Sequence, residues 1–258
     1  MEKTKIQWTE ATWNPWHGCK KVSPGCKFCY MYRDKDRYGQ DPTMILKSKT
    51  MFGQPLKWKD PQLIFTCSWS DWFIEEADAW RNEAWEIIRK TPQHTYQILT
   101  KRPERIKDNL PDFFNELNNV WIGVSVESQE QVNRIAYLND LDCITFASFE
   151  PLIGEINWDE NMNKLDWSII GGESGNDIGK FRYRPMELEW AEKLINASVK
   201  NNVKCFVKQL GTYQANILKL KDRHGGNIDE WEQKFQIRQF PDKKLGTINT
   251  TKGQLTLF

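Results

Sequence analysis

The sequence predicts an α/β protein built as a full or partial (β/α) barrel of the TIM type. Apolar runs of strand length alternate with helix-like stretches between residues 63 and 211, which is typical of βαβ units around a parallel sheet. The strand-like runs are apolar almost throughout, as in a sheet covered on both faces. Polar residues follow each run at its carboxyl end, where parallel α/β folds carry their sites. An open doubly wound sheet is the structural alternative.

The elements follow in order along the chain. A first strand is expected within residues 6–9, before a cysteine-containing loop, and residues 31–60 form an irregular charged insertion. Six strands are expected at 63–71, 95–104, 120–128, 143–151, 167–175 and 203–211, and residues 235–240 add a further candidate. Helices are expected at 75–90, 103–117, 129–138 and 185–200. Residues 1–211 would form the barrel with its N-terminal cysteine loop. Residues 212–258 would form an extension packed on it, with a frayed tail after Asp242.

Composition narrows the class of protein. The chain has 258 residues, 39% hydrophobic residues and a formal net charge of +1. This balance argues against a protein that coats nucleic acid through bulk charge, although it permits a local basic groove. The sequence shows no secretory signal and no apolar run long enough to span a membrane, so we expect a cytoplasmic protein without membrane association. In that compartment clustered cysteines indicate metal binding or catalysis more than disulfides.

The polar residues at the strand ends form a repeated pattern. They are Ser68, Ser70 and Asp71, then Thr100, Lys101 and Arg102, then Ser125 and Glu127, then Ser148 and Glu150, then Glu173 and Ser174, and finally Lys208 and Gln209. Six such ends in succession predict one shared site at the carboxyl edge of the sheet. In residues 120–127, period-two alternation places Val120, Ile122, Val124 and Val126 toward the helices. It places Trp121, Gly123, Ser125 and Glu127 toward the barrel interior.

Three of the six cysteines lie close together, at Cys19, Cys26 and Cys29, with the spacing C-x6-C-x2-C. Their surroundings are Gly, Lys, Pro and Ser, whereas Cys67, Cys143 and Cys205 lie in apolar strands and are expected to be buried and inert. The three clustered thiols suit a zinc site with His17 as fourth ligand, a redox pair, or a [4Fe–4S] cluster. The cluster reading uses all three cysteines and leaves one iron free for another ligand.

The end of this motif resembles that of the radical S-adenosylmethionine (SAM) enzymes, because aromatic Phe28 lies between the last two cysteines. The first gap has six residues, where that superfamily usually has three. The resemblance implies that the free iron binds SAM, that Phe28 packs against the adenosyl group and that the loop follows the first barrel strand. The lead-in NPWHGC also resembles the spore photoproduct lyase branch, whose members repair DNA.

Eight ordered motifs between Lys5 and Pro241 resemble a phage-associated three-cysteine-motif family of largely unassigned function. They are WNPWHGC, GCKFCY, QILTKRPERI, WIGVSVES, FEPLIG, IIGGESG, RPMELEW and FVKQLG. This resemblance implies a radical SAM-type barrel, a setting in DNA processing and a partner protein encoded nearby. Radical SAM chemistry also implies an electron donor such as flavodoxin or ferredoxin.

The same resemblance suggests roles for the residues at the strand ends. Cys19, Cys26 and Cys29 would ligate three irons. Acceptors for the SAM ammonium would come from Ser68, Ser70, Asp71 and Glu127. Partners for its carboxylate would come from Lys101, Arg102 and Ser125. The residues expected to act in catalysis are Glu127, Glu150, Glu173 and Lys208.

The substrate is indicated only by charge. Lys101, Arg102, Arg105 and Lys107 form a basic patch, and Lys20, Lys21 and Lys27 flank the cysteine motif. Such clusters suit phosphate contacts, although Arg102 to Arg105 also fit the start of a helix. We therefore expect a radical SAM enzyme that abstracts hydrogen from a nucleic acid or nucleotide, in DNA modification or repair. The alternatives are a non-catalytic zinc-binding module for nucleic acid or a protein partner, and a barrel hydrolase using Glu127, Glu150 and Glu173.

Overall fold

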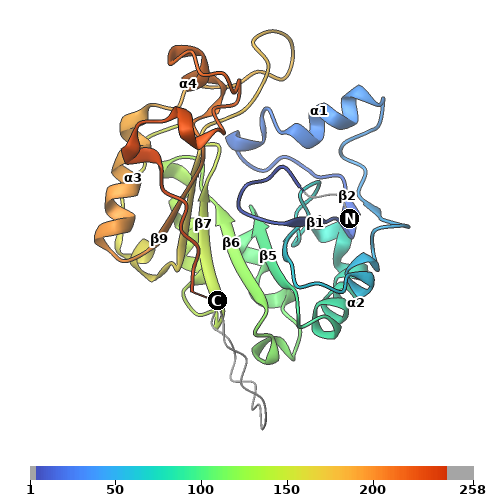
Figure 1. The fold of residues 1–258 in the computed structure, drawn as a ribbon. Coiled ribbons are helices and arrows are strands. Elements are labelled where there is room, and N and C mark those ends of the chain that lie inside the picture. The colour runs from blue at the N-terminus through green and yellow to red at the C-terminus, as the bar shows by residue number, and fades with distance from the viewer. Residues whose placement is uncertain (1–3, 243–258) are drawn as a thin grey trace.

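The fold is a seven-stranded parallel sheet that bends into a half-barrel (Figure 1). The structure is a computed structural model and describes residues 4–242. In spatial order the strands are β1 (Ala11–Trp13), β4 (Leu63–Thr66), β5 (Thr95–Thr100), β6 (Val120–Ser125), β7 (Ile144–Phe149), β8 (Trp167–Gly171) and β9 (Lys204–Gln209). All neighbouring pairs are parallel and follow chain order. The predicted α/β class is confirmed, and this sheet is compatible with a partial β/α barrel.

Within residues 4–242, four α-helices and several short 3₁₀ segments lie between and after the strands. The helices are α1 (Tyr30–Arg37), α2 (Asp78–Lys90), α3 (Leu188–Lys200) and α4 (Gly211–Ile217). A small antiparallel pair, β2 (Trp16–His17) and β3 (Leu46–Lys47), lies beside the main sheet. The 3₁₀ segments are η1 (Pro24–Cys26), η2 (Gln54–Lys57), η3 (Glu75–Ala77), η4 (Pro103–Arg105), η5 (Lys107–Asn109), η6 (Phe114–Glu116), η7 (Gln129–Leu138), η8 (Glu160–Lys164), η9 (Ile228–Glu230) and η10 (Gln233–Phe235).

The two faces of the sheet bury separate apolar clusters. The larger cluster lies between the sheet and its helices and contains Val120, Ile122 and Val124. The smaller one contains Trp121, Phe146 and Trp167 among other large side chains. The alternation expected along β6 is therefore confirmed. Gly123 is required beside Phe146, because a Cβ there would lie 2.5 Å from the phenyl ring.

Several boundary predictions are wrong. The strand before the cysteine loop is Ala11–Trp13 instead of residues 6–9, where buried Trp8 instead joins the smaller cluster. Residues 31–60 are more regular than expected, since they contain most of α1 together with β3 and η2. Residues 235–240 form no strand, and only an isolated bridge joins Phe206 to Arg238. This bridge still covers the outer edge of β9.

Two expected helices are short 3₁₀ turns in the structure. Residues 103–117 break into η4, η5 and η6. Pro111 accounts for the break between η5 and η6, because it forces extended backbone on Leu110, whose ψ is 144°. Residues 129–138 form η7, whose buried apolar residues Val132, Ile135 and Leu138 recur every third position. That spacing matches three residues per turn better than 3.6.

The C-terminal extension packs on the barrel. Trp167 Nε1 donates to Gln239 O at 2.8 Å, and the rings of Trp167 and Phe240 lie 5.3 Å apart. The tail expected after Asp242 lies outside the described residues. Within residues 4–242, no helix has the length and apolarity needed to cross a membrane.

Candidate functional site

The cysteine loop, residues 14–29, follows β1 at the carboxyl edge of the sheet. Asn14 joins the loop to the end of β4, because its Nδ2 donates to Ser68 Oγ at 3.0 Å and its Oδ1 accepts from Trp69 N at 2.9 Å. Ser70 Oγ donates to Gly18 O at 2.6 Å. Ser68 and Ser70, which were expected to bind SAM, are thus hydrogen-bonded to the loop itself.

Gly18 lets the loop pass close to its neighbour in space. Its φ is +93°, and a Cβ there would lie 2.1 Å from Met44 O. Only glycine tolerates both conditions. The residue directly before Cys19 therefore fixes the path on which the first thiol is presented.

Cys19 lies beside a buried arginine. Arg102 Nη1 is 3.9 Å from Cys19 Sγ, and Arg102 Nη2 donates to Lys20 O at 2.9 Å. Burial raises the pKa of the Cys19 thiol to about 12, Asp71 adds to the rise, and Arg102 opposes both. A positive charge at this place favours the thiolate, which is the form that binds metals.

The other two thiols have partners of different kinds. Ser23 Oγ lies 3.9 Å from Cys26 Sγ. Cys29 directly precedes α1, and the backbone N–H groups of Met31 and Tyr32 favour its thiolate, although burial is the larger effect and raises the pKa. Each clustered cysteine therefore has a polar or positive neighbour of its own.

The three thiols lie within electrostatic range of one another. Cys26 acts on the pKa of both Cys19 and Cys29, and all three add to the rise that burial causes in the pKa of Tyr32, to about 12. Tyr32 also donates to Cys19 O at 2.5 Å. Among residues 4–242, no group of three or more His, Cys, Asp and Glu side chains is drawn together as a metal site. As a donor set, three thiolates suit an iron–sulfur cluster or zinc.

The His17 ring already has a contact that would compete with metal binding. Its Nδ1 lies 2.9 Å from the Nζ of Lys35, which is only 3% exposed. Burial, followed by the charge of Lys35, lowers the pKa of His17. A role for His17 as fourth zinc ligand would require this contact to break.

Glu127, which follows β6, supports the cysteine loop through direct contacts. It is fully buried; its Oε1 accepts from Ser23 Oγ at 2.7 Å and lies 3.0 Å from Lys101 Nζ. Its Oε2 lies 3.0 Å from Arg134 Nη1. Burial opposes ionisation of Glu127, but Lys101, Arg134 and Ser23 outweigh it and lower the pKa. A Cβ on Gly25 would lie 2.3 Å from Glu127 Cγ, so the loop rests directly on this carboxylate.

Asp71 connects the end of β4 to the end of β5. Its Oδ1 accepts from Thr100 Oγ1 at 2.7 Å and from Phe73 N at 2.9 Å. Its Oδ2 accepts from Lys101 N at 2.9 Å and lies 3.1 Å from Arg102 Nη1. Both oxygens are therefore used within the protein. Asp71 orients the segment that carries Lys101 and Arg102.

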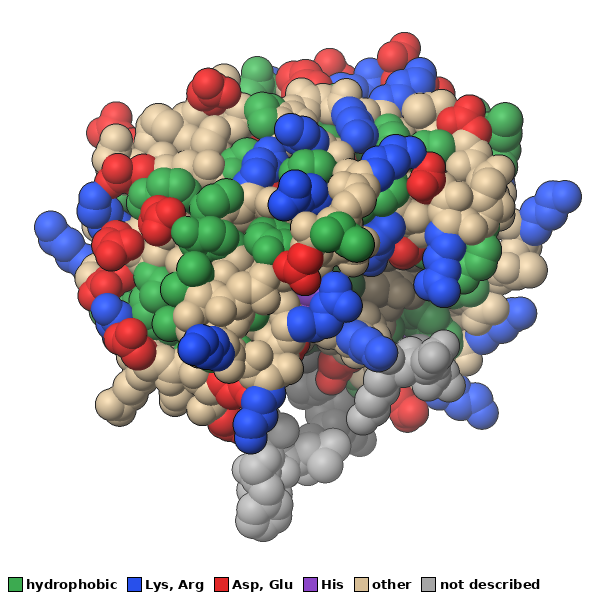
Figure 2. Space-filling view, turned by 90° about the horizontal axis from the view of Figure 1, so that it is seen from above, with side chains coloured by type: hydrophobic (Ala, Val, Ile, Leu, Met, Phe, Trp, Pro, Cys, Tyr) green, Lys and Arg blue, Asp and Glu red, His purple; other side chains and the backbone are tan. Residues whose placement is uncertain are grey.

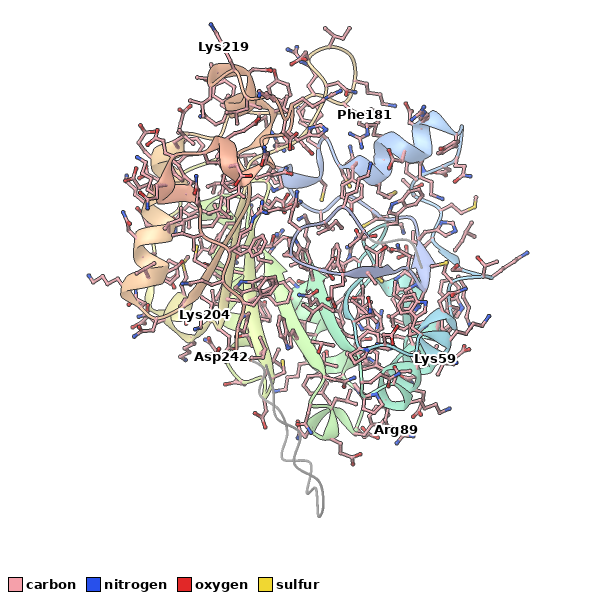
Figure 3. The ribbon with its side chains drawn as sticks, in the orientation of Figure 1. Lys59, Arg89, Phe181, Lys204, Lys219 and Asp242 are labelled. Atoms are coloured by element: carbon pink, nitrogen blue, oxygen red, sulfur yellow. The ribbon has the colours of Figure 1, made fainter. Side chains whose placement is uncertain are left out.

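Glu173, after β8, is held by Arg184. The guanidinium donates to Glu173 Oε1 at 2.5 Å and to Oε2 at 2.9 Å, while its Nη1 donates to Pro24 O at 2.9 Å. The guanidinium also lies 5.5 Å from the ring centre of Phe28. The same connection carries Phe181 close to α1 (Figure 3), and Lys180 pairs with Asp36 of that helix at 2.7 Å. The β8–α3 connection therefore contacts the cysteine loop and α1 and holds the loop in place.

Glu150 and Lys208 form an ion pair between the ends of β7 and β9. Their side chains remain 18% and 19% exposed, unlike those of Asp71 and Glu127. Burial, then Cys29 and Glu150, raise the pKa of Tyr30, which places this pair within electrostatic range of the loop. The pair is accessible to a ligand.

The expected basic patch is mostly neutralised. Lys101 pairs with Glu127, Arg102 with Asp71, and Arg105 with Asp78. Each of these three cations has a carboxylate partner within the protein, so a phosphate bound there would have to compete with that partner. Ser125 is buried beside them, and its carbonyl accepts from Arg134 at 2.7 Å.

The structure adds residues that sequence reasoning missed. Asn14, Ser23, Arg134 and Arg184 all contact the loop or its supports. Asn14 and Arg184 lie in two recognised motifs, NPWHGC and RPMELEW, so a signal for them was present. Ser23 and Arg134 carry no such signal. The inert cysteines behave as expected where buried, since Cys67 is 3% and Cys205 0% exposed, whereas Cys143 is half-buried.

Comparison with known proteins gives a family but no activity. No curated protein and no solved structure matches the chain. The family described as "Protein of unknown function (DUF5131)" matches residues 3–241. This match spans the barrel, the cysteine loop and the extension as far as Pro241. The chain belongs to the DUF5131 family.

Proposed function

We propose that the protein is a radical SAM enzyme whose Cys19, Cys26 and Cys29 hold a [4Fe–4S] cluster. The observation that carries this proposal is the set of partners around the three thiols. Arg102 lies beside Cys19, Ser23 beside Cys26, and the N-terminal backbone of α1 beside Cys29. Three thiolates supported one by one, on the loop after the first strand of a half-barrel, suit a centre with three protein ligands and one open position.

When bound, such a cluster supplies the electron that cleaves SAM to methionine and a 5′-deoxyadenosyl radical, which abstracts hydrogen from a substrate. The electron comes from a donor of the flavodoxin or ferredoxin class. The chain supplies position and shielding. Glu127 and Arg184 hold the loop from two strands, and Phe28, beneath the Arg184 guanidinium, offers an aromatic face for an adenine.

The amino-acid part of SAM needs one anion and one cation. Asp71 and Glu127, expected for this role, already use their oxygens within the protein. Glu150 and Lys208 are partly exposed and of opposite charge, so they are better placed to bind the ammonium and carboxylate groups. We assign Asp71 and Glu127 to loop support, and Glu150 and Lys208 to ligand binding.

For the substrate we propose a nucleic acid or nucleotide. Lys and Arg side chains gather on the face that bears the loop, seen from above in Figure 2. Lys21 lies over the Tyr32 ring and Lys27 over the Phe28 ring, and within residues 4–242 neither pairs with a carboxylate. Cations without a carboxylate partner, next to aromatic rings, suit phosphates and bases.

The decisive experiment is anaerobic purification of the full chain. Iron and acid-labile sulfide are measured, and 5′-deoxyadenosine release is assayed with SAM and dithionite. We expect about four irons per chain and 5′-deoxyadenosine formation. Cys26→Ala should lose both. Cys143→Ala is the matched control, since Cys143 precedes β7 at the opposite edge of the sheet and should retain both.

The contrary result is equally definite. Stoichiometric zinc with no SAM cleavage, even after anaerobic reconstitution with iron and sulfide, would reject the radical SAM function. It would favour the non-catalytic zinc-binding module. Electrophoretic mobility shifts with single-stranded and double-stranded DNA, compared between the native chain and Lys21→Ala/Lys27→Ala, test the substrate class separately.

A further inference from the structure

We propose that Arg102 sets the reduction potential of the metal centre bound by the cysteine loop, with Asp71 moderating its charge. The inference rests on the proposed cluster and assigns Arg102 as a positioning residue that acts through Cys19. Its geometry is unlike that of any other cation near the three thiols.

The guanidinium of Arg102 is fixed on several sides. Arg102 is 8% exposed, and its backbone N–H donates to Thr100 Oγ1 at 2.9 Å. Nη1 lies 3.1 Å from Asp71 Oδ2 and 3.9 Å from Cys19 Sγ, and Nη2 donates to Lys20 O at 2.9 Å. A side chain held by these contacts cannot turn toward solvent without breaking them. Its charge therefore stays beside one sulfur.

The three thiols differ in this respect. Within the described chain, Cys19 is the clustered cysteine with an arginine N–H directed at its sulfur. Lys101, the next cation, lies 3.0 Å from Glu127 Oε1 and is paired there. Cys26 and Cys29 have a neutral hydroxyl and backbone amides near them, and the charge of Lys101 also acts on both. Among the clustered cysteines of residues 4–242, Cys19 is thus the one whose sulfur a fixed cation contacts directly.

The physical effect has a definite sign. On reduction the centre gains one electron from the flavodoxin- or ferredoxin-class donor, no bond is formed or broken, and the net charge becomes more negative by one. A buried cation and an N–H···S contact both stabilise the more negative state, so they raise the potential. Asp71, next to the guanidinium, partly cancels that charge. Removing Arg102 and removing Asp71 should therefore shift the potential in opposite directions.

The test is a redox titration of the anaerobically reconstituted full chain, followed by electron paramagnetic resonance with dithionite as reductant. Arg102→Gln should lower the equilibrium constant for reduction about tenfold, which is about 59 mV for one electron. Asp71→Asn should raise it. Arg105→Gln is the matched control, because Arg105 lies on the same segment and pairs with Asp78, away from the thiols. Its potential should equal that of the native chain.

A double variant distinguishes a change in reduction potential from misfolding. Arg102→Gln alone leaves Asp71 without its cation, so Arg102→Gln/Asp71→Asn removes both charges together. Its potential should lie between those of Arg102→Gln and the native chain, because only the N–H···S contact is lost. A native potential in Arg102→Gln or in the double variant, with about four irons bound, would overturn this inference and leave the proposed function intact. Absence of an iron–sulfur centre in the native chain would overturn both.

Discussion

At the residue scale, the cysteine loop depends on a glycine that has no unusual backbone angle. Gly25 lies against Glu127, and a Cβ at this position would lie 2.3 Å from Cγ and 2.4 Å from Oε1 of that side chain. Glu127 cannot move aside, because Ser23, Lys101 and Arg134 hold it. The absence of one methyl group therefore allows loop and carboxylate to touch.

Gly25→Ala should push the loop away from its support. We expect a loss of about 1–3 kcal/mol in the free energy of unfolding, typical of overpacking, and lower iron retention after anaerobic reconstitution. Urea unfolding and iron analysis measure the two effects. Gly53→Ala is the matched control, since a Cβ there meets nothing within 4 Å. Equal stability and iron content in both variants would contradict the role of Glu127 in supporting the cysteine loop.

Residue types identified part of the site but not its internal contacts. The three cysteines stood out by spacing, and Glu127 and Asp71 by their place after strands. Their partners did not stand out, because Arg184 lies 160 residues from Pro24 and Glu127 lies 104 residues from Ser23. Such contacts depend on the folded sheet. This is why carboxylates that appeared available to a ligand are already bound within the protein.

At the element scale, the connection between α2 and β5 contains a buried histidine. His94 is 0% exposed; its Nε2 lies 3.3 Å from Pro55 O, and its Nδ1 has no hydrogen-bond partner within the described residues. Burial lowers the pKa of His94 from 6.5. The folded chain thus keeps this ring neutral, whereas the unfolded chain protonates it near its usual pKa.

This arrangement predicts a pH-dependent stability. Above pH 6.5 His94 is neutral in both states and costs nothing, and below it the unfolded state gains protons and is favoured. The urea midpoint of the native chain should fall between pH 7.5 and pH 5.5. His94→Gln should fall less over the same interval, because the ionisable ring is gone. Identical pH profiles for the two proteins would contradict a neutral buried His94.

The elements themselves were predictable to different degrees. The six expected strands after the cysteine loop all exist, because continuous apolar runs report burial on both faces. The connections were less predictable, since an apolar residue every third or fourth position fits both helix types. In η7 the buried positions Val132, Ile135 and Leu138 select the tighter form. The short strand β1 carries too few residues for any periodicity.

At the scale of the whole molecule, the half-barrel leaves β9 with an unpaired edge that the extension covers. Val207 N donates to Ile237 O and Gln239 N to Cys205 O, both at 2.8 Å. Gln239 also accepts from Cys205 N at 3.2 Å through its side chain and from Trp167 Nε1 at 2.8 Å through its carbonyl. An uncovered edge is a template for pairing with other chains.

Truncation after Gln236 should therefore destabilise the protein and promote aggregation. Besides these four hydrogen bonds, the truncation removes two that Arg238 donates to Val207 O and Lys208 O. Six lost bonds at about 1 kcal/mol each suggest a decrease of roughly 6 kcal/mol in the free energy of unfolding. Calorimetry and light scattering measure the two consequences. Truncation after Asp242 is the control, since it keeps all six bonds. If the two truncated chains are equally stable, the extension does not protect β9.

The contacts of Glu127 and Arg184 with the cysteine loop also determine when the loop can be completed during synthesis. The ribosome synthesises the three cysteines early. Glu127, which binds Ser23, follows Ser23 by 104 residues, and Arg184, which binds Pro24 O, follows Pro24 by 160 residues. At typical synthesis rates the latter interval lasts roughly 8 to 30 s. During it the nascent thiols lack at least one of the two supports and remain open to oxidants and stray metals. The cysteine loop is made before both of its supports, so any centre it holds would be delivered after Arg184 has been made.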